Sequence, residues 1–362
     1  MRARSAVAVA LSLGLLTACT SEPSAATSTS PAGSSSATPS ATPTPDVVVT
    51  GADAALAAVV EELYAGKRGI EATATVGTWD KEKVAVVTAG DDVTLAVGPS
   101  WKVVGGWWPS LNKPASLGKG PRFVLVIGSD ARPGKSLKGT RGDTLQVIGL
   151  DGKGGGGVLG LARDIWAPMP SGGHAKINAA FAYGGGTGEV QTVRTVTGLP
   201  IEGYVATGFS GFTDIVDESG GLPITIAKKV VLQGRTTVPA GQQTLSGALA
   251  LAYARERKSL PDGDFGRSAH QQELLLAAAV AARLSGVGII PKEMTSVSKH
   301  AESDLSAADA LTFVASFYKV NPLQVGHRVA KGGFGTSPDG QSIVLLDAAS
   351  KQAFRDFRDG RL

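Results

Sequence analysis

The chain has 362 residues, of which 43% are hydrophobic and 18% are charged, so it is long enough for about two domains with sizeable cores. Its 35 Lys and Arg residues against 31 Asp and Glu residues give a net charge of +4, too mild to indicate a nucleic-acid binder. A single cysteine excludes an internal disulfide framework and any metal site built from several cysteines.

The N-terminal segment has the features of a secretory signal. Two arginines precede an apolar stretch, residues 7–16, that is too short to span a bilayer. The stretch runs into Leu16-Thr17-Ala18-Cys19, which resembles the bacterial lipobox, where a peptidase cuts before a cysteine that is then acylated. We therefore expect residues 1–18 to be a signal peptide and Cys19 to carry lipid, the alternative being an ordinary signal with a chance cysteine. No later segment reads as a transmembrane span, so lipid would be the only anchor.

Two further segments precede the main domain. Residues 19–46 are Ser, Thr, Pro and Ala with almost no charge, so we expect the lipidated cysteine to be followed by a disordered tether. Residues 47–112 predict a small α+β accessory module, with a helix over 52–64 and alternating strands over 71–96. Residues 109–121 read as a linker. Three tryptophans near the end of the module predict core or interdomain packing, with a sugar-stacking platform as the alternative: Trp101, Trp107 and Trp108.

The main domain, residues 122–290, predicts an α/β fold. Its strands are strongly apolar, and they are followed by segments with helical spacing, which implies a sheet covered on both faces. The expected strands are 123–127, 144–150 and 158–162. The expected helices are 177–183, 189–197, 209–217, 245–254 and 265–284. A C-terminal α/β extension, residues 291–362, adds a helix, two strands and a final helix.

Charged and amide side chains recur at the expected element boundaries of this domain. They are Asp130, Arg132, Arg141, Asp143, Arg163, Asp164, Lys176, Asn178, Arg255, Arg257, Asp264, Arg267 and Gln271. Strand ends and helix starts would bring them to one rim of the sheet, where open α/β sheets bind ligands. Arginine offers a fixed fork of donors for phosphate oxygens, and carboxylates are natural Mg²⁺ ligands. The alternative is a set of ordinary surface ion pairs.

Two local spacings support a shared site. Arg255 and Arg257 point to one side if the helix before them has ended, because extended backbone alternates its side chains. Asp264, Arg267 and Gln271 are spaced i, i+3 and i+7 and therefore share one face of the next helix. A phosphate-binding P-loop at residues 128–136 is disfavoured, because the spacing is wrong and no helix pattern follows.

The order and spacing of six motifs resemble the LytR-CpsA-Psr family of bacterial cell-envelope ligases. The resemblance covers about residues 123–284. The motifs are Gly128-Ser129-Asp130-Ala131-Arg132, Arg141-Gly142-Asp143-Thr144, Ala162-Arg163-Asp164, Lys176-Ile177-Asn178-Ala179-Ala180 with Tyr183-Gly184-Gly185, Tyr253-Ala254-Arg255-Glu256-Arg257, and Asp264-Phe265-Gly266-Arg267 with Gln271-Gln272. Many relatives have a basic residue in place of His270 and an N-terminal transmembrane helix in place of the lipobox.

The resemblance implies an α/β/α sandwich with a hydrophobic pocket for a polyprenyl chain. Its implied metal ligands, for Mg²⁺, are Asp130 and Asp143. Its implied catalytic residues are these two aspartates together with Arg163, Arg255, Arg257 and Arg267, the arginines clamping a pyrophosphate. Further candidates for substrate binding are Arg132, Arg141, Lys176, Asn178 and Gln271. If His270 touched phosphate, that contact would depend on pH.

The implied reaction moves a glycopolymer from a polyprenyl-pyrophosphate carrier to a cell-wall acceptor, with peptidoglycan as the default, and releases polyprenyl phosphate. The protein would be a magnesium-dependent phosphotransferase held by its lipid on the outer face of the cell membrane. Two alternatives stay open. One is a pyrophosphatase that hydrolyses the same substrate, and the other is a non-catalytic lipoprotein that binds polyprenyl phosphates.

Overall fold

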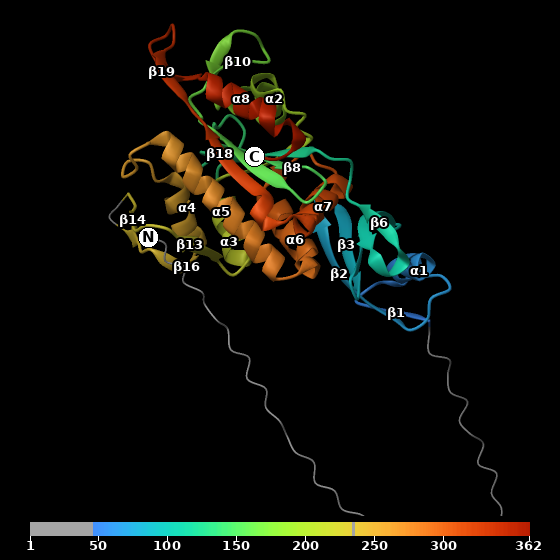
Figure 1. Cartoon of the computed structure of the whole chain (residues 1–362). Helices are drawn as coiled ribbons and strands as arrows, with labels where there is room; N and C mark the ends of the chain where they lie inside the picture. Colours follow the sequence, from blue (N-terminus) through green and yellow to red (C-terminus); the bar gives the residue numbers. More distant parts are fainter. Residues whose placement is uncertain (1–45, 234–235) are drawn as a thin grey trace, which may run out of the picture. The chain divides into compact units, whose positions relative to one another are not determined.

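A six-stranded sheet with one helix forms the first part of the computed structural model, which describes residues 46–233 and 236–362 (Figure 1). The sheet runs in the order β1 (Val47–Thr50), β2 (Ile70–Trp79), β3 (Glu82–Ala89), β4 (Asp92–Val97), β5 (Lys102–Trp108) and β6 (Lys113–Ser116). Helix α1 (Ala54–Leu63) begins where Asp53 accepts a hydrogen bond from the Leu56 N–H at 2.9 Å. The predicted α+β module is therefore present. The expected signal peptide, Cys19 and nearly all of the tether lie outside the described residues.

The module is longer than predicted. Strand β6 pairs with β5, so the sheet continues to Ser116, and residues 113–116 belong to it rather than to a linker. Trp101 and Trp108 are buried, and Lys319 lies over the half-buried ring of Trp107 at 5.2 Å. These contacts confirm the packing role predicted for the tryptophans and leave no open aromatic platform at them.

The second sheet is mixed and organises the rest of the chain. Its order is β17 (Glu302–Ser303), β12 (Gly203–Thr207), β7 (Arg122–Ser129), β8 (Gly142–Leu150), β9 (Gly156–Leu161) and β18 (Val325–Ala330). The three predicted strands are confirmed as β7, β8 and β9, which form an antiparallel meander. The C-terminal extension supplies both edge strands, so it completes the main sheet rather than following it.

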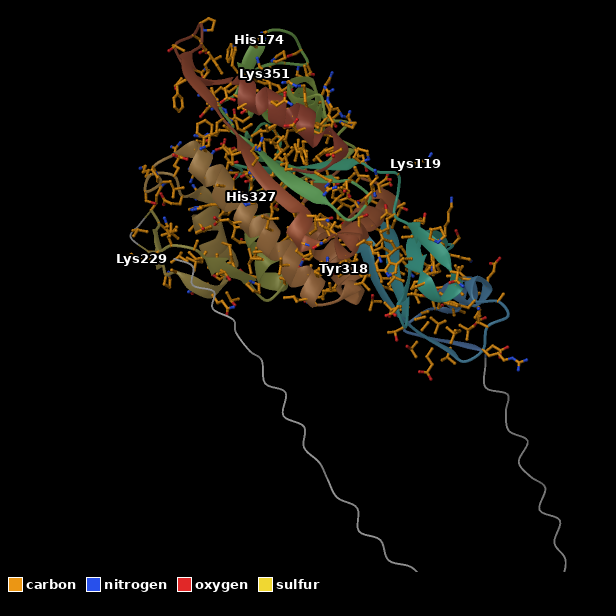
Figure 2. The ribbon with its side chains drawn as sticks, in the orientation of Figure 1. Lys119, His174, Lys229, Tyr318, His327 and Lys351 are labelled. Atoms are coloured by element: carbon orange, nitrogen blue, oxygen red, sulfur yellow. The ribbon has the colours of Figure 1, made fainter. Side chains whose placement is uncertain are left out.

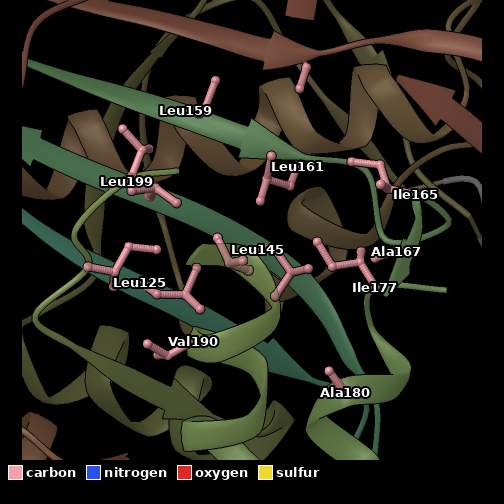
Figure 3. Close-up of a cluster of buried hydrophobic side chains, with 14 of the residues drawn as sticks. Leu125, Leu145, Leu159, Leu161, Ile165, Ala167, Ile177, Ala180, Val190 and Leu199 are labelled. Carbon is pink, nitrogen blue, oxygen red and sulfur yellow. The ribbon is translucent and has the colours of Figure 1, made fainter. Parts of the chain in front are cut away.

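Helices cover both faces of this sheet, which confirms the α/β/α fold. One face packs on α2 (Ala179–Thr197) and α8 (Ala348–Asp356), and Figure 3 shows Leu125, Leu145 and Val190 in that core. The other face carries α5 (Asp264–Leu284) and α7 (Ala307–Ser316). The two helices expected at 177–183 and 189–197 correspond to the two parts of α2, which are separated by a kink at Gly185, where the φ of 60° favours glycine.

The remaining elements complete the layers. They are β10 (Trp166–Pro168), β11 (His174–Lys176), α3 (Phe209–Glu218), β13 (Leu222–Ile226), β14 (Val230–Val231), β15 (Thr237–Val238), β16 (Gly241–Leu245), α4 (Gly247–Arg255), α6 (Ile290–His300), β19 (Gly332–Thr336) and β20 (Ser342–Leu346). The C-terminal extension therefore has one more helix and more strands than predicted. Across residues 46–233 and 236–362, no single helix is long and apolar enough to cross a membrane; only the bent pair formed by residues 264–284 and 287–300 passes by length and composition.

Candidate active site

A cavity of about 1090 Å³ lies between the second face of the main sheet and the helices that cover it. Val124, Val126 and Ile148 of the sheet line it, facing apolar residues of α5 and α7 such as Leu274 and Phe313. The apolar residues after Gln271 on α5 thus form one wall of the cavity. The polar and charged lining residues among the predicted site set are Asp130, Arg132, Asp143, Arg163, Arg255, Arg257, Arg267 and Gln271.

The antiparallel meander explains why three of these residues meet. Strand β7 ends at Ser129, β8 begins at Gly142 and β9 ends at Leu161, and antiparallel pairing puts these three points at the same edge of the sheet. Asp130, Asp143 and Arg163 therefore converge at one edge. Strand ends thus bring these residues to one rim of the sheet, as predicted, and the antiparallel meander is the reason.

Asp143 is the most tightly held acidic group in the cavity. Its Oδ2 accepts a hydrogen bond from Arg163 Nη1 at 2.5 Å, and its Oδ1 accepts one from Asn178 Nδ2 at 2.9 Å. Arg267 Nη2 donates to the Asp143 carbonyl oxygen at 3.2 Å. Both carboxylate oxygens are thus oriented by side chains from other elements, which fixes the carboxylate at the cavity wall.

Arg163 and Arg267 form a partly buried network with further carboxylates. Arg267 Nη2 lies 2.8 Å from Asp264 Oδ1, and Arg163 Nε lies 3.8 Å from the same oxygen and 3.7 Å from Asp164 Oδ2. Burial raises the pKa of Asp264, although the two guanidinium groups oppose this. Burial lowers the pKa of Arg267, and Asp264 opposes that shift. Arg267 still remains a cation at any working pH.

Arg255 and Arg257 lie on the same side because α4 ends between them. Glu256 has extended backbone, with φ −66° and ψ 129°, and its buried carboxylate accepts hydrogen bonds from the Gln233 and Ser259 N–H groups at 2.7 and 2.9 Å. Both arginines line the cavity, as the spacing predicted. The Arg255 guanidinium lies over the Phe209 ring at 4.3 Å. A stacked guanidinium keeps its in-plane donors available for a ligand.

A buried polar network fixes the start of α5 on the sheet. Gln146 Nε2 donates to Ser268 Oγ at 3.0 Å and to Gln271 Oε1 at 3.3 Å, and Gln271 Nε2 donates to the Ala254 carbonyl at 3.1 Å. Gly160 makes this close approach possible, because a Cβ there would collide with Ser268 Oγ and Gln146 Oε1. The network thereby places the polar face of α5 at the cavity.

Several predicted residues lie at the border of the site. Arg141 is exposed and bonded through its backbone to Asp130, and Lys176 Nζ lies 2.8 Å from Asp164 Oδ1; neither lines the cavity. Arg132 lines both this cavity and a neighbouring hollow.

His270 does not line the cavity, so the structure gives no basis for the pH-dependent phosphate contact. It stacks on Tyr253 at 4.1 Å between ring centroids. Burial lowers the pKa of His270.

Residues of the cavity wall that the sequence missed include Trp79, Phe209 and Lys258. Of these three, only Lys258 could have been found from the sequence, because it directly follows Arg255 and Arg257. Within the described part of the chain, no group of three or more His, Cys, Asp or Glu side chains could hold a metal on its own. Figure 2 accordingly shows His174 and His327 in separate parts of the fold.

The apolar cavity with a charged end and the α/β/α fold are the features that the sequence motifs led us to expect. Residues 102–356 match the LytR-CpsA-Psr family, and the chain belongs to that family. The match extends beyond the motif region in both directions and takes in the end of the module and the C-terminal extension.

Curated relatives carry the names of transferases. The chain is 32% identical over 211 residues to the polyisoprenyl-teichoic acid–peptidoglycan teichoic acid transferase TagV of Bacillus subtilis, covering 55% of this chain and 54% of TagV. It is 32% identical over 236 residues to the transferase TagU of Bacillus mycoides, covering 64% of this chain and 76% of TagU. The match thus spans only about half the length of TagV.

Solved structures agree on the fold. The crystal structure of B. subtilis TagV matches with a TM-score of 0.57 and 27% identity, covering 67% of this chain and 96% of that one. A structure of TagT bound to LIIa-WTA matches with a TM-score of 0.56 and 25% identity, covering 69% of this chain and 94% of that one.

Proposed function

We propose that the protein transfers a glycopolymer from a polyprenyl-pyrophosphate carrier to a cell-wall acceptor, with peptidoglycan as the acceptor. The observation that carries the proposal is one largely apolar cavity with five arginines and two aspartates in its lining. Such a cavity suits a ligand with a long hydrocarbon chain and a phosphate group at one end. The names of the relatives, which act on polyisoprenyl-linked teichoic acid and peptidoglycan, support the same substrate class.

The arginines would hold the pyrophosphate. Arg255 and Arg257 extend from the end of α4, and Arg163 and Arg267 face them from the sheet and from α5. Each guanidinium donates to phosphate oxygens in a fixed fork, and charge grows on those oxygens as the reaction proceeds. Arg132 would extend the contact outward, and Asn178 would keep Asp143 oriented.

The reaction is a substitution at phosphorus. A hydroxyl oxygen of the acceptor sugar bonds to the glycan-side phosphorus, and the bond from that phosphorus to the bridging oxygen breaks. Polyprenyl phosphate leaves with the electron pair, and the hydroxyl proton passes to the carboxylate of Asp130, which is exposed at the cavity. The arginines stabilise the charge on the phosphoryl oxygens and on the leaving group.

Asp130 and Asp143 suit a magnesium ion, because Mg²⁺ is commonly held by one or two carboxylates together with substrate phosphates. A bound Mg²⁺ would supply charge neutralisation at the phosphates.

We also propose that the protein is anchored outside the cell membrane by lipid on Cys19. The lipobox-like Leu16-Thr17-Ala18-Cys19 and the apolar stretch before it support this location. A polyprenyl carrier resides in the membrane, so an anchor with a tether would keep the cavity near its substrate.

The test is transfer of a polyprenyl-pyrophosphate-linked glycan to peptidoglycan by the purified protein with Mg²⁺, with products identified by mass spectrometry. We expect Arg255→Ala and Arg257→Ala each to lower the transfer rate about a hundredfold, because each removes a donor to the reacting phosphates. The matched control is Arg355→Ala, an exposed arginine of α8 on the opposite face of the sheet.

Three results would contradict the proposal. Wild-type rates in both cavity variants would show that these arginines do not hold the reacting phosphates. Glycan released only into solution would instead indicate a pyrophosphatase. Tight binding of polyprenyl phosphate without any turnover would indicate a carrier lipoprotein.

A further inference from the structure

The accessory module packs on the same helices that line the cavity. The sheet face opposite α1 forms one apolar cluster with α6 and α7, in which Val86 and Leu95 of the module meet Met294 and Leu311. Figure 1 shows β2 and β3 beside these two helices. Met294 of α6 and Ala310 of α7 also line the cavity. The module is therefore separated from the cavity by no more than one helix layer.

Hydrogen bonds fix β2 against α6 and the turn before it. Thr75 Oγ1 donates to the Gly288 carbonyl at 2.9 Å, and the Thr78 N–H donates to Thr295 Oγ1 at 2.8 Å. Gly77 lies so close to α6 that a Cβ there would collide with the Pro291 carbonyl oxygen. Because protein interiors are close-packed, these contacts fix the position of the end of β2 relative to α6.

The segment that follows α7 also contacts the module, and hydrogen bonds fix this segment to the end of α5. Tyr318 Oη donates to the carbonyls of Ala282 and Gly286 at 2.9 and 3.2 Å, and Figure 2 shows Tyr318 between the long helices and the module. Lys319, the next residue, lies over the module's Trp107. The module is thus held by contacts from α6 and from the segment after α7.

Trp79, the last residue of β2, is the point where the module reaches the cavity itself. Its side chain is buried, its indole Nε1–H donates to the Leu305 carbonyl at 2.9 Å, and both residues line the cavity. Leu305 packs in the same apolar cluster as Val124 of β7. Val124 precedes Asp130 by six residues, which is about 20 Å along a strand. Trp79 therefore lies well away from the phosphate-binding end.

We infer that the module, through Trp79, forms the distal wall of the cavity and selects polyprenyl carriers whose chains are long enough to reach it. The inference rests on the proposed function, since it concerns the lipid part of the same donor. Trp79 precedes residue 102, where the family match begins, so this wall is added by the part of the chain outside the match. The indole is fixed by its hydrogen bond and by the surrounding core, so the small part of it that faces the cavity is held in place at little entropic cost.

The experiment compares two probes by isothermal titration calorimetry on the full chain. Undecaprenyl phosphate has eleven isoprene units, whereas farnesyl phosphate has only three and is expected to end before the Trp79 end of the cavity. We expect Trp79→Ala to weaken undecaprenyl phosphate about threefold, because only 6% of Trp79 is exposed and roughly 30 Å² of apolar contact is lost, and to leave farnesyl phosphate unchanged. Trp79→Phe, which keeps an aromatic ring, is expected to keep most of the long-chain affinity.

The matched control is Trp101→Ala, in the same module. Trp101 is equally buried, but its indole bonds to Asp53 on the α1 side of the sheet and does not line the cavity. Unchanged undecaprenyl affinity in Trp79→Ala, or an equal loss in Trp101→Ala, would overturn the inference while leaving the proposed function intact. A wild-type protein that binds neither probe would overturn the proposed function itself.

Discussion

Glu189 gives the sharpest test of the electrostatics of this fold. It lies fully buried in α2, where its Oε2 accepts a hydrogen bond from the Phe181 N–H at 2.8 Å and its Oε1 has no partner among the described residues. Burial raises the pKa of Glu189 well above its ordinary 4.5, since one backbone hydrogen bond offsets only part of the lost hydration. The folded protein therefore binds this proton more tightly than the unfolded chain does.

The consequence is a loss of stability with rising pH. Between 4.5 and the raised pKa, unfolding releases the Glu189 proton, so this group lowers the free energy of unfolding by about 1.4 kcal/mol for each pH unit. Glu189→Gln has nearly the same shape, can still accept from Phe181 and has no proton to lose. The stability of the variant relative to the wild type is therefore expected to rise by about 1.4 kcal/mol from pH 5 to pH 6.

Urea denaturation of both proteins at successive pH values from 5 to 8 measures this difference directly. Glu61→Gln, on the exposed side of α1, controls for the substitution itself and should change the free energy of unfolding by less than about 0.5 kcal/mol. A stability difference between Glu189→Gln and the wild type that stays constant across this range would refute the reasoning. It would mean that the carboxyl group is ionised in the folded protein despite its burial.

Two further predictions concern the charged end of the cavity. Arg267→Ala is expected to lower the free energy of unfolding by about 2 kcal/mol, because it leaves the half-buried Asp264 without its nearest cation; thermal unfolding equal to wild type would contradict this. Asn178→Ala removes one of the two side chains that orient Asp143 and should lower kcat/KM for glycan transfer at least tenfold. It should also raise the Mg²⁺ concentration needed for half-maximal rate, and an unaltered Mg²⁺ dependence would speak against the role given to Asp143.

The elements and motifs of the main domain were largely predictable from sequence. Apolar runs located β7, β8 and β9, and helical spacing located α3, α4 and α5 to within a few residues. Such patterns indicate which side of a single helix or strand is buried. They also placed the arginines and aspartates at element ends, from which their convergence followed.

Contacts between distant segments could not be predicted in this way. Glu189 is the first residue of the helix expected at 189–197, and only the packing of α2 against the sheet shows that its side chain is buried. Trp79 lies within the region 71–96 where strands were expected, and its contact with the cavity depends on Leu305, more than 200 residues later. Strand β17 has only two residues and β18 is partly exposed, so neither has a clear strand pattern in the sequence. Both join the main sheet because they pair with β12 and β9, which are distant in the sequence.

Four of the five arginines that line the cavity fall into two kinds, those paired with carboxylates of the fold and those without such a partner. Arg163 and Arg267 are buried or half-buried and lie within 4 Å of carboxylates, so the unliganded fold compensates their charge. Arg255 and Arg257 are exposed, and no ion pair to either is present in residues 46–233 and 236–362. A bound pyrophosphate would give these two cations their counter-charge without displacing the pairs that hold the fold. Loss of Arg255 or Arg257 should therefore impair transfer and spare stability, whereas loss of Arg267 should impair both.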